Sequence, residues 1–104
     1  VIIDLDNFKA INDNHGHPAG DCALRLVGQT LREDIRAMDS AARLGGDEFV
    51  LLLSHTTKRD AASRAQRLGW KLNNLALAWE GDIVPIRASL GLKTFGGSDD
   101  FDMI

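Results

Sequence analysis

The sequence predicts an α/β domain, an α+β sandwich with a central, mostly antiparallel sheet flanked by helices in the order β-α-α-β-β-α-β. Three observations favour this class. Short β-branched or apolar runs alternate with longer stretches whose apolar residues recur at helical spacing. The glycine pair Gly45-Gly46 joins two of these short runs and predicts a tight hairpin turn. The 104 residues, 44% of them hydrophobic, are enough for one core.

The first half of the chain is expected to form a strand, two helices and a hairpin. Residues 1–5 are a β-branched run that predicts the first strand. Residues 7–14 predict a short helix, because His15-Gly16 is a typical helix stop. Residues 41–53 predict the hairpin. Apolar residues at helical spacing predict a second helix that ends near residue 36, namely Leu24, Val27, Leu31 and Ile35.

The second half is expected to form one helix and one strand. Residues 57–60 resemble a capping box. The stripe of the third helix consists of Ala61, Ala65, Leu68, Leu72 and Leu75. Trp70 and Trp79 are interpreted as packing at the edges of this helix. Residues 83–95 predict a strand, with Pro85 at an edge or bulge. After a turn at 96–100, Asp99 or Asp100 is expected to cap a new helix.

Composition and charge exclude several kinds of partner. The formal net charge is −3, so nucleic acid is not expected to bind, and an anionic ligand must be met by local groups. No run reaches the ~18 to 20 apolar residues of a membrane span, and no charged-then-apolar leader precedes Val1. We therefore expect a cytoplasmic domain without membrane contact by this segment, although a parent protein could be anchored elsewhere.

Two carboxylate pairs stand where strands end. Asp4 and Asp6 lie on one face of the first strand by alternation, and Asp47 and Glu48 follow the glycine pair. Hard oxygen ligands of this kind suit Mg²⁺ or Mn²⁺, and Mg²⁺ usually shares its coordination with substrate phosphates. The sequence therefore predicts a divalent-metal site. Asp6 is kept out of the metal set because it directly precedes a helical segment and is interpreted as its cap.

The residues from Gly45 to Phe49 read GGDEF, the signature of the diguanylate cyclases, and the resemblance covers nearly the whole chain. Further blocks are similar to the family's DxDxFKxIND, GHxxGD, RxxD and late SxG blocks, in this order: residues 4–13, 16–21, 36–39 and 87–92. So many ordered matches make coincidence negligible. The chain resembles a GGDEF domain over 1–104 that is incomplete at both ends, because the family's DxLTGLxNR-like and YxAKxxGRN-like blocks are not in it.

The resemblance implies a fold like that of nucleotide cyclases and polymerase palms. It also implies that two GTP molecules are condensed into cyclic di-GMP and two pyrophosphates, by a homodimer in which each subunit presents one GTP. Sensory or phosphodiesterase domains are expected in the parent chain. Two other interpretations remain open: a regulatory module that binds GTP or cyclic di-GMP in a larger protein, and a domain that serves only dimerisation or structure.

Site residues follow from the resemblance and from their chemistry. The metal ligands would be Asp4, the Leu5 carbonyl, Asp47 and Glu48. One acid of the pair Asp47 and Glu48 would take the hydroxyl proton in place of binding the metal, and the sequence leaves open which one.

The substrate-binding residues would be Phe8, Lys9, Asn12, Asp21, Gly45 and Gly46, with Asn12 and Asp21 recognising guanine. Lys9 as a solvated charge and Asn12 as helix-end polarity are the alternatives. His15 and His17 are interpreted as loop polarity, since two histidines alone are weak evidence for a metal.

Arg36 and Asp39 form the RxxD block, which in this family is the inhibitory site for the product cyclic di-GMP. Arginine can grip phosphate bidentately, and aspartate can accept from the guanine edge. Arg64 or Arg67 on the next helix would join them, and Arg67 is included in the predicted inhibitory site. The alternative is an Arg36–Asp39 pair that only stabilises a helix end.

Overall fold

The computed structural model of this chain describes residues 1–93. The predicted end of the last strand at residue 95, the turn at 96–100 and the helix cap at Asp99 or Asp100 lie outside the described residues.

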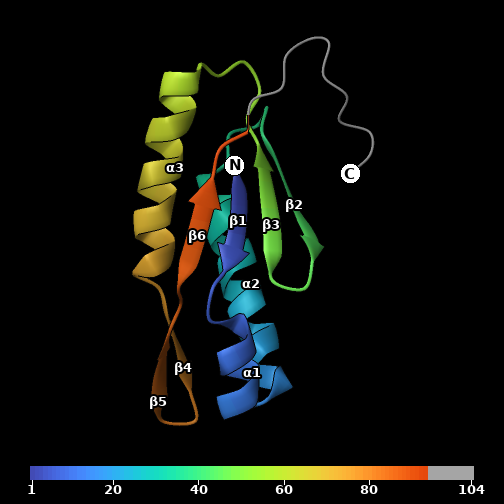
Figure 1. Ribbon diagram of the computed structural model, residues 1–104, viewed down its shortest axis with the longest axis vertical. Helices are drawn as coiled ribbons and strands as arrows, with labels where there is room; N and C mark the ends of the chain where they lie inside the picture. Colours follow the sequence, from blue (N-terminus) through green and yellow to red (C-terminus); the bar gives the residue numbers. More distant parts are fainter. Residues whose placement is uncertain (94–104) are drawn as a thin grey trace.

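A four-stranded antiparallel sheet forms the centre of the molecule (Figure 1). Its strands are β1 (Ile2–Leu5), β2 (Ser40–Gly45), β3 (Glu48–Leu52) and β6 (Ala88–Gly91), in the spatial order β2-β3-β1-β6. The predicted fold class, an α+β sandwich with a mostly antiparallel sheet, is confirmed.

Three helices accompany the sheet: α1 (Phe8–His15), α2 (His17–Asp34) and α3 (Lys58–Asn73). In Figure 1, α2 lies behind the sheet and α3 runs beside β6. Alternation along β1 turns Ile3 and Leu5 into the core, where both are buried. Asp4 is exposed and belongs to the opposite face of the sheet. The core under the first face includes Val27, Leu31, Leu51, Leu68, Leu72 and Ile86.

The helix starts and stops follow the expected signals. Gly16 ends α1 and precedes α2 with φ of 91°, a conformation that favours glycine. Thr57 caps α3, because its hydroxyl oxygen accepts from the backbone N–H of Asp60 at 3.1 Å. The capping-box prediction at 57–60 is therefore confirmed for the Thr57 bond.

The predicted element order lacks one hairpin. Strands β4 (Ala76–Trp79) and β5 (Asp82–Pro85) form a separate two-stranded sheet, so the order is β-α-α-β-β-α-β-β-β. Helix α3 ends at Asn73, before Leu75, and Trp79 belongs to β4. The predictions that Leu75 continues the helix and that Trp79 packs at its edge are wrong. Trp70 does lie on α3, but it is 70% exposed and not packed.

Backbone geometry and side-chain bonds explain this hairpin. Glu80 and Gly81 have φ of 47° and 87°, the pair of positive angles that a tight two-residue turn requires. The side chain of Asn73 bonds the backbone N–H and C=O of Ala88 at 2.9 and 3.0 Å, which fixes the start of β6 next to the end of α3. The predicted strand 83–95 is therefore two strands, because Pro85 ends β5 and the chain changes sheets before Ala88.

Candidate functional site

The strand register brings the predicted carboxylates together. Strands β1 and β3 pair antiparallel with Asp4 directly opposite Glu48. The backbone N–H of Leu5 donates to the carbonyl of Asp47 at 3.0 Å, which continues the pairing into the turn. Residues separated by more than 40 positions in the chain therefore meet at one end of the two central strands. Directly opposed side chains in an antiparallel pair have Cβ atoms about 5 Å apart. We call Asp4, Leu5, Asp47 and Glu48 the carboxylate cluster.

The carboxylate cluster carries like charges at close range. A side-chain hydrogen bond to Asp4 raises the pKa of Glu48, and the charge of Asp4, burial and the charge of Asp47 raise it further. Asp4 is exposed, and Asp47 and Glu48 are half-buried. The cluster is therefore reachable from solvent, and its negative charge is not balanced by a cation from the described residues around it.

The glycine turn beside these carboxylates is open. Gly45 and Gly46 have φ of 151° and 45°, and a Cβ atom added to either would meet no other atom within 4 Å. The guanidinium of Arg43 donates from Nε to the carbonyl of Gly46 at 3.0 Å and braces the turn. A bare backbone with open space outside it lets a ligand phosphate approach closely.

Helices α1 and α2 hold a buried amide oxygen without a partner. The Asn12 Oδ1 atom is buried and accepts no hydrogen bond among the described residues. Gly20 on α2 makes room for it, since a Cβ there would collide with the Asn12 amide and lie 3.2 Å from Phe8 Cε1. An unsatisfied buried acceptor costs about 1–3 kcal/mol. The arrangement therefore fits a ligand donor at Asn12, and Gly20 is a residue whose role sequence reasoning missed.

A cavity of about 380 Å³ lies between α2 and the β2–β3 hairpin. Asp21 and Leu24 line it from α2, and Arg43 and Phe49 line it from the two hairpin strands. Arg25 and Arg32 also face it. The cavity places the predicted guanine residue Asp21 in the same hollow as the arginine that braces the glycine turn. The spacing of residues 21, 25 and 32 on one helix face was the signal that could have revealed the arginines.

The remaining predicted substrate residues differ in their surroundings. Phe8 is half-buried against the core, and Lys9 is exposed at the first turn of α1.

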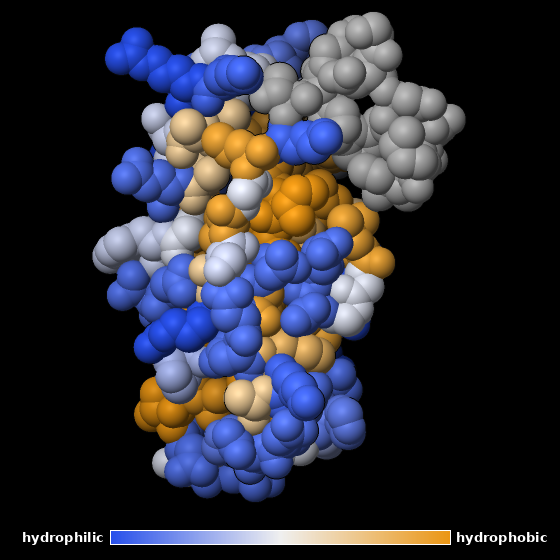
Figure 2. Space-filling view, in the orientation of Figure 1, coloured by the Kyte–Doolittle hydropathy of each residue, from blue (hydrophilic) through white to orange (hydrophobic). Residues whose placement is uncertain are grey.

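A larger groove of about 900 Å³ contains none of the predicted site residues. It is lined mainly by apolar side chains such as Ile2, Val50 and Leu52, at the other end of β1 and β3 from the carboxylate cluster. Figure 2 shows an apolar area above a polar one on this face of the molecule.

Asp6 and the two histidines have other roles. The N-cap residue of α1 is Asn7, so the interpretation of Asp6 as the cap is wrong. The Asp6 carboxylate instead accepts from the Ser89 hydroxyl at 2.7 Å. His15 lies 4.0 Å from the Asp82 carboxylate, and His17 is exposed. His15 is the last residue of α1 and His17 the first residue of α2, so the interpretation of the two histidines as loop residues is wrong, and both stand at helix ends.

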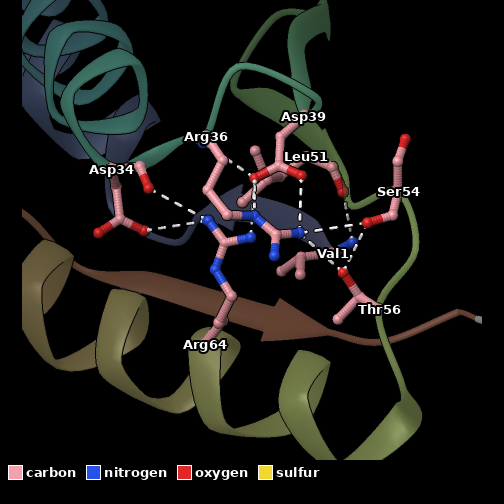
Figure 3. A network of polar contacts seen from close by, with 8 residues as sticks. All are labelled: Val1, Asp34, Arg36, Asp39, Leu51, Ser54, Thr56 and Arg64. Atoms are coloured by element: carbon pink, nitrogen blue, oxygen red, sulfur yellow. Dashed lines mark hydrogen bonds and ion pairs between the residues drawn. The ribbon is translucent and has the colours of Figure 1, made fainter.

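The RxxD block forms the centre of an arginine network (Figure 3). Arg36 donates from Nε to one carboxylate oxygen of Asp39 and from Nη2 to the other, both at 3.0 Å. The backbone N–H of Arg36 adds a bond of 2.9 Å, and Arg64 Nη1 adds one of 2.8 Å. These bonds, those from Arg36 first, hold the pKa of the buried Asp39 carboxyl well below its usual range.

Further contacts link this network to three elements. Arg36 Nη2 donates to the Ser54 carbonyl at 3.2 Å and to the Thr56 hydroxyl at 2.8 Å. Arg64 Nη2 donates to the Asp34 carbonyl at 3.1 Å. Lys71 Nζ lies 3.1 Å from the Asp34 carboxylate. The network thus joins the end of α2, the loop after β3 and helix α3, which is more than a local pair at a helix end.

The second arginine of the network is Arg64. Arg67, which the predicted inhibitory site includes, is exposed on α3 and makes no bond to Asp39. The structure brings Arg36, Asp39 and Arg64 together in the absence of a ligand, and a role for Arg67 in ligand binding stays a prediction.

The donor set of the carboxylate cluster decides whether a divalent cation fits it. Among residues 1–93, no group of three or more histidine, cysteine, aspartate or glutamate side chains is arranged to hold a metal. Mg²⁺ is usually bound by only one or two carboxylates, with water and substrate phosphates completing its coordination. Two opposed carboxylates, whose hydrogen bond and like charges raise the pKa of Glu48, provide such a donor set. The residues therefore fit the cation that the sequence predicts.

Solved structures share this fold. A diguanylate cyclase from Pseudomonas aeruginosa, SiaD in complex with its activator SiaC, superposes with a TM-score of 0.80 at 33% identity, over 85% of this chain and 34% of that one. The GGDEF domain of DgcB from Caulobacter crescentus, solved with cyclic di-GMP, gives 0.79 at 25% identity, over 85% of this chain and 53% of that one. The sheet, helices and hairpin turn described above are thus those of a GGDEF domain.

The family model "Diguanylate cyclase, GGDEF domain" matches residues 1–103, and the chain belongs to this family. The resemblance stated from the sequence is confirmed.

Diguanylate cyclase DosC of Escherichia coli K12 is 34% identical over 105 residues, which cover 100% of this chain and 23% of DosC. The bifunctional diguanylate cyclase/cyclic di-GMP phosphodiesterase MucR of Pseudomonas aeruginosa is 41% identical over 97 residues, 93% of this chain and 14% of MucR. The chain therefore spans less than a quarter of the length of these relatives. No helix in residues 1–93 is both long and apolar enough to span a bilayer.

Proposed function

We propose that this chain is the catalytic domain of a diguanylate cyclase, which condenses two GTP molecules into cyclic di-GMP and two pyrophosphates. The observation that carries the proposal is the register that sets Asp4 opposite Glu48 beside the open glycine turn. Carboxylates alone would repel a triphosphate, so the cluster suits a nucleotide that arrives with a divalent cation. Family membership supports the same activity.

In this proposal the carboxylate cluster holds Mg²⁺ or Mn²⁺ through Asp4, the Leu5 carbonyl and one or both of Asp47 and Glu48. The cation, when bound, neutralises phosphate charge as the α-phosphate is attacked by a 3′-hydroxyl. Asp47 or Glu48 takes the proton of that hydroxyl. The raised pKa of Glu48 supports Glu48 for this task.

The nucleotide is held by the residues around the α1–α2 pair. The orphan Asn12 oxygen and the Asp21 carboxylate in the cavity accept from the guanine N1 and N2 donors, a pattern that adenine lacks. Phe8 and Lys9 lie beside the phosphates, and Gly45 and Gly46 let them approach the backbone. Two domains must face each other, because each subunit presents one GTP, so the active form is a homodimer.

The RxxD block is proposed as the inhibitory site for cyclic di-GMP, built on Arg36 and Asp39 with a further arginine, Arg64 or Arg67, on α3. A regulatory domain that binds GTP or cyclic di-GMP is the second candidate function. The arginine network around Asp39 favours it, and a bifunctional relative such as MucR illustrates the setting. Sensory or phosphodiesterase domains in the parent protein and a cytoplasmic location complete the proposal.

One experiment tests the first candidate against the second. The full-length protein is incubated with GTP and Mg²⁺, pyrophosphate release and cyclic di-GMP are measured, and cyclic di-GMP binding is measured by calorimetry. Product formation that needs the metal supports the cyclase. Binding of cyclic di-GMP without any synthesis, with Mg²⁺ or Mn²⁺, would replace the cyclase with the regulatory domain.

A further inference from the structure

Arg36 and Arg64 both bind Asp39, but they are held in different ways. The Arg64 side chain is 11% exposed and lies between Asp39 and Asp34. The Arg36 side chain is 44% exposed. Arg64 is therefore a fixed support for Asp39, whereas Arg36 is the arginine that an arriving ligand can reach.

The guanidinium of Arg36 has two edges, and each has a different partner. The Nε/Nη2 edge grips both oxygens of Asp39. The other edge consists of Nη1 and the second N–H of Nη2. Nη2 has two hydrogens but three acceptors within reach, Asp39, the Ser54 carbonyl and the Thr56 hydroxyl, and the bond to Thr56 is the shortest at 2.8 Å. The Thr56 hydroxyl therefore occupies the N–H that the second edge would offer.

The direction of the Thr56 hydroxyl is fixed by its neighbour. It donates its own hydrogen to the Ser54 carbonyl at 2.9 Å. Its lone pair is thereby turned toward Arg36, whose guanidinium has no acceptor atom and can only donate. Arg36 Nη1 makes no hydrogen bond within residues 1–93. Half of the second edge is thus free and half is held by Thr56.

A phosphate bound bidentately by arginine uses two parallel N–H groups of one edge. Asp39 already occupies the first edge of Arg36, so a phosphodiester must use the Nη1/Nη2 edge. We propose that Thr56 is a positioning residue of the RxxD site, which occupies the phosphate-binding edge of Arg36 until an anionic ligand displaces it. This inference rests on the proposed binding of cyclic di-GMP at Arg36, and it means that the chain's own hydroxyl sets the sensitivity to product.

The test compares two substitutions at Thr56 in the full-length protein. Thr56→Val keeps the shape of the side chain and removes the acceptor, and Thr56→Ser keeps the acceptor. We expect Thr56→Val to lower the inhibition constant for cyclic di-GMP about three- to tenfold, which is the range for the net contribution of one ordinary intramolecular hydrogen bond. The kcat and KM for GTP at low product should remain those of the unmodified protein. Thr56→Ser should retain the unmodified inhibition constant.

Three results would overturn the inference. If the unmodified protein binds cyclic di-GMP through Arg36, as loss of binding in Arg36→Ala would demonstrate, unchanged or weaker inhibition of Thr56→Val means that Thr56 does not compete with the ligand. If the unmodified protein binds no cyclic di-GMP by calorimetry, the proposed inhibitory site fails and this inference fails with it. A fall in kcat or a rise in the KM for GTP that accompanies a changed inhibition constant would assign Thr56 a general structural role instead.

Discussion

Strand β3 carries a charged group at each end, and the two groups are balanced differently. At its start, Glu48 faces Asp4 and shares a hydrogen bond with another acid. Just beyond its end, Ser54 and Thr56 bind Arg36, whose partner Asp39 is buried and receives bonds from two arginines. Strand β3, Glu48–Leu52, alone separates the two groups by roughly 13 Å, at ~3.3 Å per residue. One group has too much negative charge, and the other has its charges paired.

The difference separates what the charges do for function from what they do for stability. Carboxylates that repel one another within reach of solvent do not hold a fold together, so the carboxylate cluster suits a site completed by a cation. A buried carboxylate with several donors holds elements in place, and removing one partner leaves a buried charge uncompensated. We therefore expect substitutions at the two ends of β3 to have opposite profiles, with loss of activity at one and loss of stability at the other.

The largest effect is expected at the carboxylate end. Glu48→Gln should lower synthesis of cyclic di-GMP from GTP by about a thousandfold, through loss of a ligand or base at the reacting group. The free energy of unfolding should not fall, because the substitution removes repulsion with Asp4. A pyrophosphate-release assay and urea unfolding measure the two quantities. Glu33→Gln, an exposed glutamate on α2, is the matched control and should change neither.

The next effect is expected at the arginine end. Asp39→Asn should lower the free energy of unfolding by about 2–3 kcal/mol at pH 7, because Arg36 and Arg64 both lose a charged acceptor. Urea unfolding followed by circular dichroism gives the number, and the exposed Asp13→Asn is the control. A loss of stability no larger than that of the control would show that the network is not a structural support.

A third effect concerns GTP and the metal at the carboxylate cluster. GTP at about a hundred times its dissociation constant should stabilise the protein by about 2.7 kcal/mol, visible as a rise in Tm. This rise should disappear in chelator and should shrink in Asp4→Asn, whereas Arg36→Ala should keep it. Equal stabilisation by GTP with chelator and with Mg²⁺ would contradict the assignment of metal ligands.

The sequence predicted most of the carboxylate end because its signals are local. Each pair of acids adjoins its own local signal: Asp4 and Asp6 adjoin the β-branched run, and Asp47 and Glu48 adjoin the glycine pair. Alternation placed Asp4 correctly on the face away from the core. The register that sets Asp4 opposite Glu48 depends on pairing between distant segments. It could not be derived from either segment alone.

Two features could not be predicted because packing decides them. Leu75 and Trp79 continue an apolar spacing that fits either a helix or a strand, and the bonds of Asn73 to Ala88 decide for the β4–β5 hairpin. Arg64 and Arg67 are both on α3, and the rotation of the helix selects one. Leu68 and Leu72 are fully buried, so Arg64, one turn before Leu68, is directed into the network.

The smallest effect is the pH dependence, and its sign should differ between the two ends. The pKa of Asp39 is lowered by folding, so its contribution is complete above its unfolded value of about 3.9 and is lost as the pH falls below it. The stability difference between the unmodified protein and Asp39→Asn should therefore shrink as the pH falls from 5 toward 2.

The pKa of Glu48 is raised by folding, so the folded protein keeps the proton on Glu48 up to a higher pH than the unfolded chain does. Glu48 should therefore lower stability as the pH rises from its unfolded value of about 4.3 through its folded value, and Glu48→Gln should remove this small decline. Urea unfolding between pH 2 and 7 measures the stability difference between the unmodified protein and each variant. If these two differences changed with pH in the same direction, the contrast between the two ends of β3 would be contradicted.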